Sequence, residues 1–376
     1  MKREISKPNE IQKVEDIVRL LLEGENDWLQ YGKVNVRTHP TNPDLRIFNY
    51  RNDAFRGEGY TQFEILSRGL IINARTGEIV GRAFDKFFNY GEYGIEFKPV
   101  GKIKNVYEKV DGNIGVLYRD GDIYKISTRG RFDSDAATWA TEFLNNKFNL
   151  TGLENELTLI FEIVNPSIRV IVDYEGLEDI VLLAARNRFT GEYVDLNNLI
   201  GIAQRYGFNL PSIYSFNTID DIVKAAKLLD QNSEGYVIEY EDGSRWKIKG
   251  DRYRHIAKLV INLNFRNTVR AMRDGVMDAY LDLIPAEFMV YVNQWIAKIE
   301  TYKSEMINYF KDILASLPEE TRSDKKSLAI WITENYGKKS SEANYLLSVH
   351  MGKDISRGLY QEMLELPNEF IDLTNE

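Results

Sequence analysis

The sequence predicts an α+β domain built on antiparallel sheets, followed by an all-helical C-terminal domain. Residues 45–183 consist mostly of short β-like runs separated by glycine-containing turns, a pattern typical of strands joined by tight turns. Asp120-Gly121-Asp122 lies between two such runs and indicates a hairpin. After about Tyr253 turn signals become rare, and apolar residues recur at helical spacing, as over residues 289–299. We therefore expect antiparallel pairing rather than a doubly wound sheet in the first domain.

The expected elements follow one another along the chain. Residues 9–31 predict a helix because apolar residues from Ile11 to Leu22 recur at helical spacing, and Pro40 and Pro43 then interrupt the chain. Strands are expected at residues 45–50, 67–73, 106–108, 114–119, 122–127, 157–164 and 180–186. Helices are expected at residues 136–148, 196–206 and 219–229, and residues 235–240 and 244–248 form a second hairpin around Glu241-Asp242-Gly243.

Composition limits the classes of protein to consider. A chain of 376 residues suggests two domains, which we divide as residues 1–254 and 255–376. No apolar run approaches the roughly 18–20 residues of a membrane helix, and the charged N-terminus lacks the apolar segment of a signal peptide, so we expect a cytoplasmic protein. The absence of cysteine excludes disulfides, thiol nucleophiles and cysteine-ligated zinc, and three histidines leave little room for histidine metal sites.

The net charge of −9 does not indicate nucleic-acid binding, but charge is distributed unevenly along the chain. Nine arginines and lysines lie between Arg245 and Arg273, with Asp251 as the only acid. A solvated helix face would also explain this run. Its position beside a pair of lysines favours a phosphate-binding surface.

That pair is Lys247 and Lys249, which are two residues apart in an expected strand and therefore face the same side. Two adjacent ammonium groups repel each other unless an anion lies between them, and a triphosphate is a good candidate. Solvated lysines on an exposed edge strand are the alternative.

Lys109 follows a β-like run and precedes Asp111-Gly112. Gly112 would let the backbone approach a ligand closely, so the setting favours a nucleophile over an ordinary surface lysine. A lysine must lose its proton before it attacks phosphorus, and we expect neighbouring cations such as Lys249, together with a metal ion, to lower the pKa of Lys109.

Glu162 and Glu234 each lie among hydrophobic residues of expected strands. An unpaired carboxylate there is costly, so each is paired, at an edge or functional. They could accept a ribose hydroxyl or hold the water shell of Mg²⁺. Outward-facing strand glutamates remain the alternative for each taken alone.

Taken in chain order, these residues resemble the motifs of the covalent nucleotidyltransferases, which include nucleic-acid ligases and mRNA capping enzymes. The similar segments are Lys109-Val110-Asp111-Gly112, Phe161-Glu162, Glu234-Gly235-Tyr236-Val237 and Lys247-Ile248-Lys249. Residues 45–50, 67–71, 86–92 and 161–166 resemble more narrowly the ATP-dependent RNA ligase 1 family of tailed phages. The resemblance covers roughly residues 40–255 and implies a nucleotidyltransferase (ligase) fold for the first domain.

The resemblance implies ATP-dependent sealing of RNA in three in-line displacements at phosphorus. Lys109 would form a lysyl-AMP, and Lys247 and Lys249 would contact the α-phosphate and stabilise its developing charge. Arg46 and Lys86 match family positions that engage the β- and γ-phosphates and orient the pyrophosphate leaving group.

The resemblance also implies a metal site of few ligands. Glu162 would take the ribose hydroxyl or metal-bound water, Glu234 would support the Mg²⁺ shell beside the attacked phosphate, and Asp111 would position metal water or the lysine. The cofactors implied are ATP and Mg²⁺, with Mn²⁺ as a substitute. Mg²⁺ prefers water plus few carboxylates, so this sparse set is adequate.

The implied partner is RNA with 5′-phosphate and 3′-hydroxyl ends, such as a broken tRNA, which a monomer would bind partly through residues 255–376. The residues assigned to RNA are Arg129, Arg131, Arg252, Tyr253 and Arg254. Arg129 departs from the family pattern, which has a lysine before Gly130. Arginine keeps the charge but presents a planar fork.

Other classes are less consistent with the sequence. A DNA ligase or a GTP-using capping enzyme normally continues into a strand-rich β-barrel, whereas here the following residues predict helices. A catalytically silent RNA-binding protein would not need the complete set of lysines and glutamates. A metal-dependent nuclease would need a denser carboxylate cluster.

Overall fold

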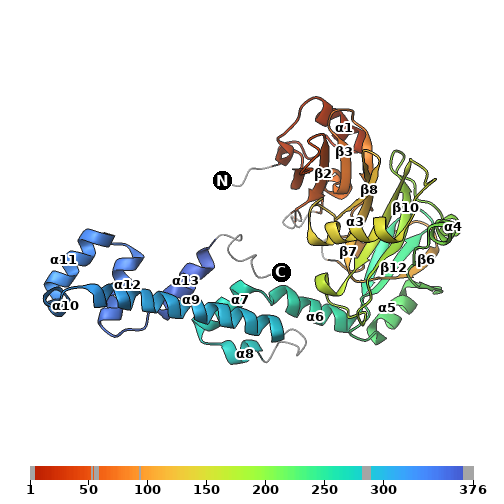
Figure 1. The fold of residues 1–376 in the computed structure, drawn as a ribbon. Coiled ribbons are helices and arrows are strands. Elements are labelled where there is room, and N and C mark those ends of the chain that lie inside the picture. The colour runs from red at the N-terminus through yellow and green to blue at the C-terminus, as the bar shows by residue number, and fades with distance from the viewer. Residues whose placement is uncertain (1–4, 52–53, 55–58, 93–94, 282–288, 367–376) are drawn as a thin grey trace. The chain divides into compact units, whose positions relative to one another are not determined.

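The computed structural model describes residues 5–51, 54, 59–92, 95–281 and 289–366. The chain divides into two compact units, Met1–His255 and Ile256–Glu376 (Figure 1). Helix α6 (Asp251–Asn262) contains the point of division.

The first unit contains three sheets. Their strand orders are β1-β2-β3-β4, β10-β9-β7-β8 and β11-β6-β12-β13-β5. The strands are β1 (Val34–Thr38), β2 (Leu45–Tyr50), β3 (Arg68–Asn73), β4 (Ile79–Arg82), β5 (Phe88–Asn89), β6 (Ile103–Glu108), β7 (Asn113–Asp120), β8 (Ile123–Ser127), β9 (Leu157–Val164), β10 (Asp179–Asn187), β11 (Ile213–Tyr214), β12 (Gly235–Tyr240) and β13 (Arg245–Lys249). All pairings between these strands are antiparallel except that of β13 with β5.

Each sheet of the first unit packs against helices. The helices are α1 (Val14–Leu22), α2 (Gln62–Leu66), α3 (Asp135–Lys147), α4 (Leu196–Tyr206) and α5 (Ile219–Leu228), with short 3₁₀ turns at Trp28–Gln30 and Pro166–Ile168. Buried Val14, Ile17 and Leu21 recur at helical spacing, so α1 presents one apolar face to the core that includes Phe48 and Leu70. Helix α1 therefore covers the β1–β4 sheet.

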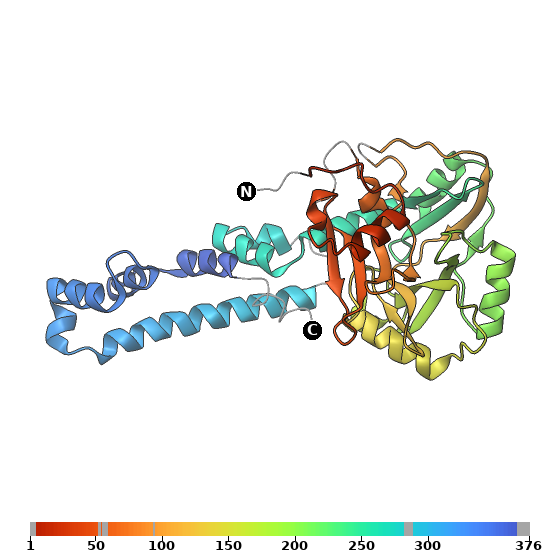
Figure 2. The ribbon, with the colours of Figure 1, turned by 90° about the horizontal axis from the view of Figure 1, so that it is seen from above.

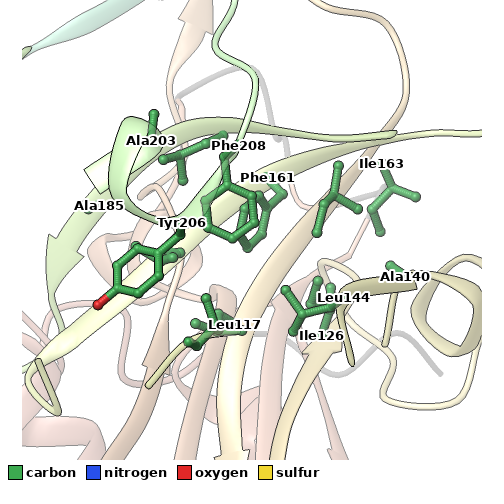
Figure 3. Packing of buried hydrophobic residues seen from close by; sticks show 14 of the residues in the cluster. Leu117, Ile126, Ala140, Leu144, Phe161, Ile163, Ala185, Ala203, Tyr206 and Phe208 are labelled. Atoms are coloured by element: carbon green, nitrogen blue, oxygen red, sulfur yellow. The ribbon is translucent and has the colours of Figure 1, made fainter. Parts of the chain in front are cut away.

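The sheet that contains β9 has a core of its own. Side chains of β7–β10 pack there with those of α3 and α4, and Figure 3 shows Phe161 of β9 beside Phe208, which follows α4. The centroids of these two rings are 5.0 Å apart. Helix α3 begins at Ser134, whose side chain accepts a hydrogen bond from the backbone N–H of Ala137. This packing holds β9, the strand that carries Glu162, in a rigid setting.

The second unit is helical over its described residues. Its helices are α7 (Phe265–Asp274), α8 (Met277–Leu281), α9 (Met289–Ser316), α10 (Glu319–Ser323), α11 (Lys325–Tyr336), α12 (Ser341–His350) and α13 (Ser356–Glu365). The long helix α9 packs against α7, α12 and α13, and Figure 2 shows it running beside the C-terminal helices. Phe310 and Leu314 on α9 pack with Leu346 of α12 in one apolar cluster.

The predicted fold class, an α+β domain with antiparallel sheets followed by helices, is confirmed. The helix expected at residues 9–31 is shorter, because α1 ends at Leu22 and Gly24 then adopts a φ of 87°, which only glycine enters easily. Four strands were not expected from the sequence: β1, β4, β5 and β11. Of the residues expected to be helical, 282–288 and 367–376 lie outside the described part of the chain.

Candidate active site

Strand register brings Lys109, Glu234 and Lys249 to one end of the third sheet. Lys109 directly follows β6, Glu234 directly precedes β12, and Lys249 is the last residue of β13. Gly235 pairs with Lys249, and Tyr236 pairs with Glu108, so the three candidate residues lie at matching positions of adjacent strands. The backbone N–H of Lys109 donates to the carbonyl oxygen of Gly235 at 2.9 Å.

Two glycines allow the close approach of these strands. Gly235 has a φ of 147°, and a Cβ there would lie 2.0 Å from the carbonyl oxygen of Ile248. At Gly112 a Cβ would lie 2.3 Å from the carbonyl oxygen of Ile163, next to Glu162 on β9. Both positions therefore require glycine, and Gly112 brings the loop of Lys109 against the strand of Glu162.

Glu234 forms an ion pair with each of two lysines. Its Oε2 lies 2.7 Å from Nζ of Lys109, and its Oε1 lies 2.8 Å from Nζ of Lys249. The side chain of Glu234 is only 3% exposed. Burial alone would raise the pKa of Glu234, but the charges on Lys109 and Lys249 lower it below its ordinary value. Glu234 is therefore a carboxylate shared by the two lysines.

The pKa of Lys109 is raised, and our expectation that neighbouring cations lower it is wrong for the ligand-free chain. Burial would lower the pKa, but the carboxylates of Glu234 and Glu162 outweigh burial. Glu234 comes within 2.7 Å of the amine, whereas the sequence analysis considered only neighbouring cations such as Lys249 and a metal ion. Lys109 is thus held as an ammonium ion.

Glu162 and Lys247 lie in the wall of a cavity of about 700 Å³, together with Lys109. Burial, opposed by Lys109 and reinforced by Glu234, raises the pKa of Glu162 to about 7. Burial and the positive charges of Arg68 and Lys109 lower the pKa of Lys247 well below its ordinary value. The ammonium of Lys247 lies 4.5 Å from the centroid of the Phe87 ring. An anionic ligand in the cavity would therefore stabilise the charged form of Lys247.

Asp111 uses both carboxylate oxygens within the protein. Oδ2 accepts from the backbone N–H groups of Ile171 and Val172, at 2.8 Å and 2.7 Å, and Oδ1 accepts from the hydroxyl of Tyr253 at 2.8 Å. In this arrangement Asp111 ties the lysine loop to the loop after β9 and to the start of α6. That geometry fits the expected role of positioning the lysine.

Glu162, Glu234 and Asp111 have the carboxylate chemistry that Mg²⁺ prefers. Within the described part of the chain, however, no three histidine, cysteine, aspartate or glutamate side chains are grouped closely enough to hold a metal ion directly. Glu162 receives no hydrogen bond or ion pair from the described residues. The donor set fits an ion held mainly through water.

The residues expected to bind the phosphates of ATP or the RNA do not all line the cavity. Arg129 and Arg131 line the cavity. Lys86 lines an adjoining hollow, and its ammonium lies 4.6 Å from the centroid of the Tyr50 ring, which faces the cavity. Arg46 does not line the cavity, and its guanidinium donates to the carbonyl oxygens of Pro43 and Leu45.

The position of Arg46 follows from the alternation of side chains in β2. Leu45 and Ile47 pack with Tyr118 of β7, while Phe48 packs on the opposite side, in the core with α1. Arg46 shares the side of Phe48. An irregularity between Phe48 and Asn49 then breaks the alternation, and Asn49 and Tyr50 beyond it both line the cavity.

Of the residues at the start of α6, only Tyr253 is buried, against Asp111. Arg252 and Arg254 are exposed, and Arg254 pairs with Asp251. None of the three lines the cavity.

Residues to which the sequence analysis gave no role also lie at the cavity. Arg68 lines it, next to Lys247, and its guanidinium carbon lies 5.8 Å from the centroid of the Phe87 ring. Arg37 lines it too and donates to the carbonyl oxygen of Gly130 at 2.8 Å. Arg68 carried a usable signal, since Ser67-Arg68-Gly69 belongs to a segment that resembles the RNA ligase 1 family. Arg37 lies on β1, which the sequence did not predict.

Among the described residues, no helix combines the length and apolar character that a membrane span needs.

Comparison with known proteins gives a family match. A family model described as RNA ligase matches residues 66–254, the segment that contains Lys109, Glu162, Glu234, Lys247 and Lys249. The chain is 28% identical over 283 residues to a protein of Autographa californica nuclear polyhedrosis virus named "Putative bifunctional polynucleotide kinase/RNA ligase", a match that covers 67% of this chain and 39% of that protein.

Two further comparisons have similar or lower identity. A "Putative RNA ligase" of Thermovibrio ammonificans is 29% identical over 187 residues, which is 47% of each chain. The chain thus matches less than half the length of either curated relative. A solved structure, the "Putative ATP-dependent DNA ligase from Aquifex aeolicus", is 16% identical with a TM-score of 0.46, covering 91% of this chain and 88% of that one.

Proposed function

This chain belongs to the RNA ligase family, and we propose that it uses ATP to join a 5′-phosphate end and a 3′-hydroxyl end of RNA. Lys109 Nζ attacks the α-phosphorus of ATP, so that an N–P bond forms and pyrophosphate leaves. An oxygen of the RNA 5′-phosphate then attacks the same phosphorus and releases the lysine. In the last step the 3′-hydroxyl attacks the 5′-phosphate and releases AMP.

The observation that carries this proposal is the division of charge in the cavity. Lys109 and Lys249 both pair with Glu234. Arg68 and Lys247, by contrast, form no ion pair with a carboxylate of the described residues, although both are half-buried at the cavity. Buried charges are costly unless something pairs with them. A nucleophilic amine beside unpaired cations fits a triphosphate substrate.

The roles of the side chains follow from their positions. Lys247, which lines the cavity, stabilises the charge that develops at the attacked phosphate. Lys249 keeps Glu234 in place beside Lys109. Arg68, rather than Arg46, is placed to engage the terminal phosphates, because Arg68 lines the cavity and Arg46 does not. Since these groups are preorganised, they stabilise the transition state without reorganisation.

Lys109 must be released from its ion pair before it can attack. Glu234 and Glu162 are placed to hold a divalent cation through water, and Mg²⁺ or Mn²⁺ bound there would supply positive charge near the α-phosphate. Drawing Glu234 away from Lys109 would remove the interaction that raises the pKa of the amine. The amine would then lose its proton more easily.

Glu162 gives a pH-dependent prediction. We propose that its carboxylate accepts a ribose hydroxyl of ATP, and a charged acceptor binds such a donor more strongly than a neutral one. Because its pKa is about 7, the carboxylate forms as pH rises from 6 to 8, and affinity for unreactive α,β-methylene-ATP should rise about 5-fold beyond the ligand's own titration. Calorimetry at several pH values measures this.

The matched control is Glu162→Gln, which keeps the shape but cannot ionise. Its pH dependence should be that of the ligand alone. Identical pH profiles for the two proteins would contradict the role of Glu162.

We propose that the helical unit recognises structured RNA, that a broken tRNA is the natural substrate, and that the protein acts as a cytoplasmic monomer.

Removing the residues after Asn262, which keeps α6 whole, should leave enzyme–AMP formation within about 2-fold of that of the untruncated chain, because the cavity lies in the first unit. Sealing of a nicked tRNA anticodon loop should fall at least about 10-fold relative to a short single-stranded RNA. Equal losses on both RNAs would refute a role in substrate choice.

Incubation with α-labelled ATP or GTP and Mg²⁺, followed by denaturing electrophoresis, tests the proposed function. Label retained from ATP supports it, and label from GTP alone would move the protein to the capping class. If neither nucleotide labels the chain and added pyrophosphate converts no bound AMP into ATP, the proposal fails. Sealing of 5′-phosphorylated RNA but not of the matching DNA then establishes the nucleic acid.

A further inference from the structure

Tyr50, the last residue of β2, contributes to the cavity wall and contacts two cations. The guanidinium carbon of Arg129 lies 5.0 Å from the centroid of the Tyr50 ring, and Nη1 of Arg129 donates to the Tyr50 hydroxyl at 3.1 Å. The ammonium of Lys86 lies 4.6 Å from the same ring and 5.0 Å from that of Phe88. Lys86 therefore lies over the rings of Tyr50, Tyr60 and Phe88, and Arg129 lies over that of Tyr50.

This environment leaves the positive charges available to a ligand. An aromatic face attracts a cation through its quadrupole but does not neutralise it, and within the described residues neither Arg129 nor Lys86 forms an ion pair with a carboxylate. Burial would raise the pKa of Tyr50, but the charges on Arg129, Lys86 and Arg68 lower it. All three cations are thus close enough to act on the phenol.

The contact matters more for an arginine than for a lysine. A lysine is a compact point charge, whereas the planar guanidinium grips an anion only in a particular orientation. Tyr50 restrains that orientation twice, with its ring face and with its hydroxyl. Tyr50 is in turn fixed by the backbone, since its N–H donates to the carbonyl oxygen of Ser67 at 2.7 Å.

The stereochemistry of the proposed reaction indicates that the region around Arg129 and Lys86 takes two ligands, one after the other. In the first step the leaving pyrophosphate must lie opposite Lys109 Nζ on the α-phosphorus. In the second step the lysine leaves, so the attacking oxygen of the RNA 5′-phosphate must also lie opposite Nζ. The N–P bond breaks as the new P–O bond forms, and Nζ regains a proton. Pyrophosphate therefore leaves on the same side of the α-phosphorus from which the 5′-phosphate later attacks.

We propose that Tyr50 is a positioning residue that orients Arg129 in one anion subsite, which takes first the pyrophosphate group of ATP and then the 5′-phosphate of the RNA. This inference rests on the proposed function for its second ligand. Its first ligand can be tested without catalysis, because inorganic pyrophosphate can be bound to the unreacted protein.

The test compares Tyr50→Phe, which keeps the ring, with Tyr50→Leu, which removes it. The dissociation constant of inorganic pyrophosphate, measured by calorimetry, should rise about 10-fold in Tyr50→Phe and further in Tyr50→Leu. In single turnovers of isolated enzyme–AMP, the concentration of 5′-phosphorylated RNA that gives half the maximal rate should rise by a similar factor. Methylenediphosphonate should compete with that RNA in the wild-type chain.

Arg129→Lys supplies the control for mechanism. If Tyr50 acts by orienting the guanidinium of Arg129, then adding Tyr50→Phe to Arg129→Lys should change pyrophosphate binding less than about 3-fold. The effects of the two substitutions on binding would then not add. Additive effects would overturn the positioning role, as would wild-type pyrophosphate binding by Tyr50→Phe. Weakened pyrophosphate binding with unchanged RNA dependence would overturn the shared subsite. A wild-type chain that binds pyrophosphate in this way but forms no enzyme–AMP would instead refute the proposed function.

Discussion

Replacing Lys109 with alanine should abolish the covalent enzyme–AMP that we expect the unsubstituted chain to form with labelled ATP. Nζ of Lys109 is the only atom of this side chain that can form the N–P bond. Lys249, which pairs with the other oxygen of Glu234, does not line the cavity as Lys109 does, so we expect that it cannot replace Lys109. Denaturing electrophoresis with α-labelled ATP measures the loss. A variant that still accumulates label would show that another residue is the nucleophile.

Lys104→Ala is the matched control for this experiment. Lys104 lies on β6, the strand that leads to Lys109, but its side chain is 43% exposed and pairs with Glu239 at 3.4 Å. It does not line the cavity. The control should label as the wild type does. The Lys109→Ala protein should keep a cooperative thermal unfolding transition, since the pair of Glu234 with Lys249 remains.

Replacing Lys247 with methionine should lower the rate of enzyme–AMP formation roughly 100- to 1,000-fold, the effect typical of removing one preorganised group that stabilises developing charge. The side chain of Met retains the apolar contact with Phe87 but carries no charge. Rapid-quench measurement of label incorporation at saturating ATP gives the rate. A loss below about 5-fold would show that Lys247 does not contact the reacting phosphate.

The same substitution should make the protein more stable. Burial and the charges of Arg68 and Lys109 lower the pKa of Lys247, so at neutral pH the charged form is unfavourable in the ligand-free fold and favourable in the unfolded chain. Removing it should raise Tm by about 2–4 °C. Lys224→Ala, an exposed change on α5, should alter neither Tm nor the rate. A lower Tm for Lys247→Met would contradict this account of its electrostatics.

The sequence predicted much of the fold because the relevant signals are local. The Asp-Gly turn between β7 and β8 and the hairpin of β12 and β13 both appear where turn residues separate β-like runs. Strands β1 and β4 gave weaker signals, since polar and exposed positions interrupt β1 and β4 has only 4 residues. The parallel pairing of β5 with β13 joins residues far apart in sequence, and no local pattern reports it.

The site was predictable as a set of residues but not as a geometry. Glu234 and Lys109 are 125 residues apart, and only the register of β12 against β6 brings their charged atoms to 2.7 Å. For this reason the direction of the Lys109 pKa shift could not be obtained from sequence neighbours. Arg46 was assigned because it matches a family position, but which side chains of a strand reach a cavity depends on tertiary packing. Beyond the irregularity between Phe48 and Asn49, Tyr50 of the same strand lines the cavity, whereas Arg46 does not.

The ion pair between Glu234 and Lys109 also protects the chain chemically. An amine reacts with aldehydes, acyl phosphates and similar electrophilic metabolites only when it is uncharged, and Glu234 keeps Lys109 charged while no substrate is bound. The residue is therefore least reactive during the intervals when it would be exposed to irrelevant small molecules. Its damage should be slow in resting protein and should accelerate when Glu234 is replaced by glutamine.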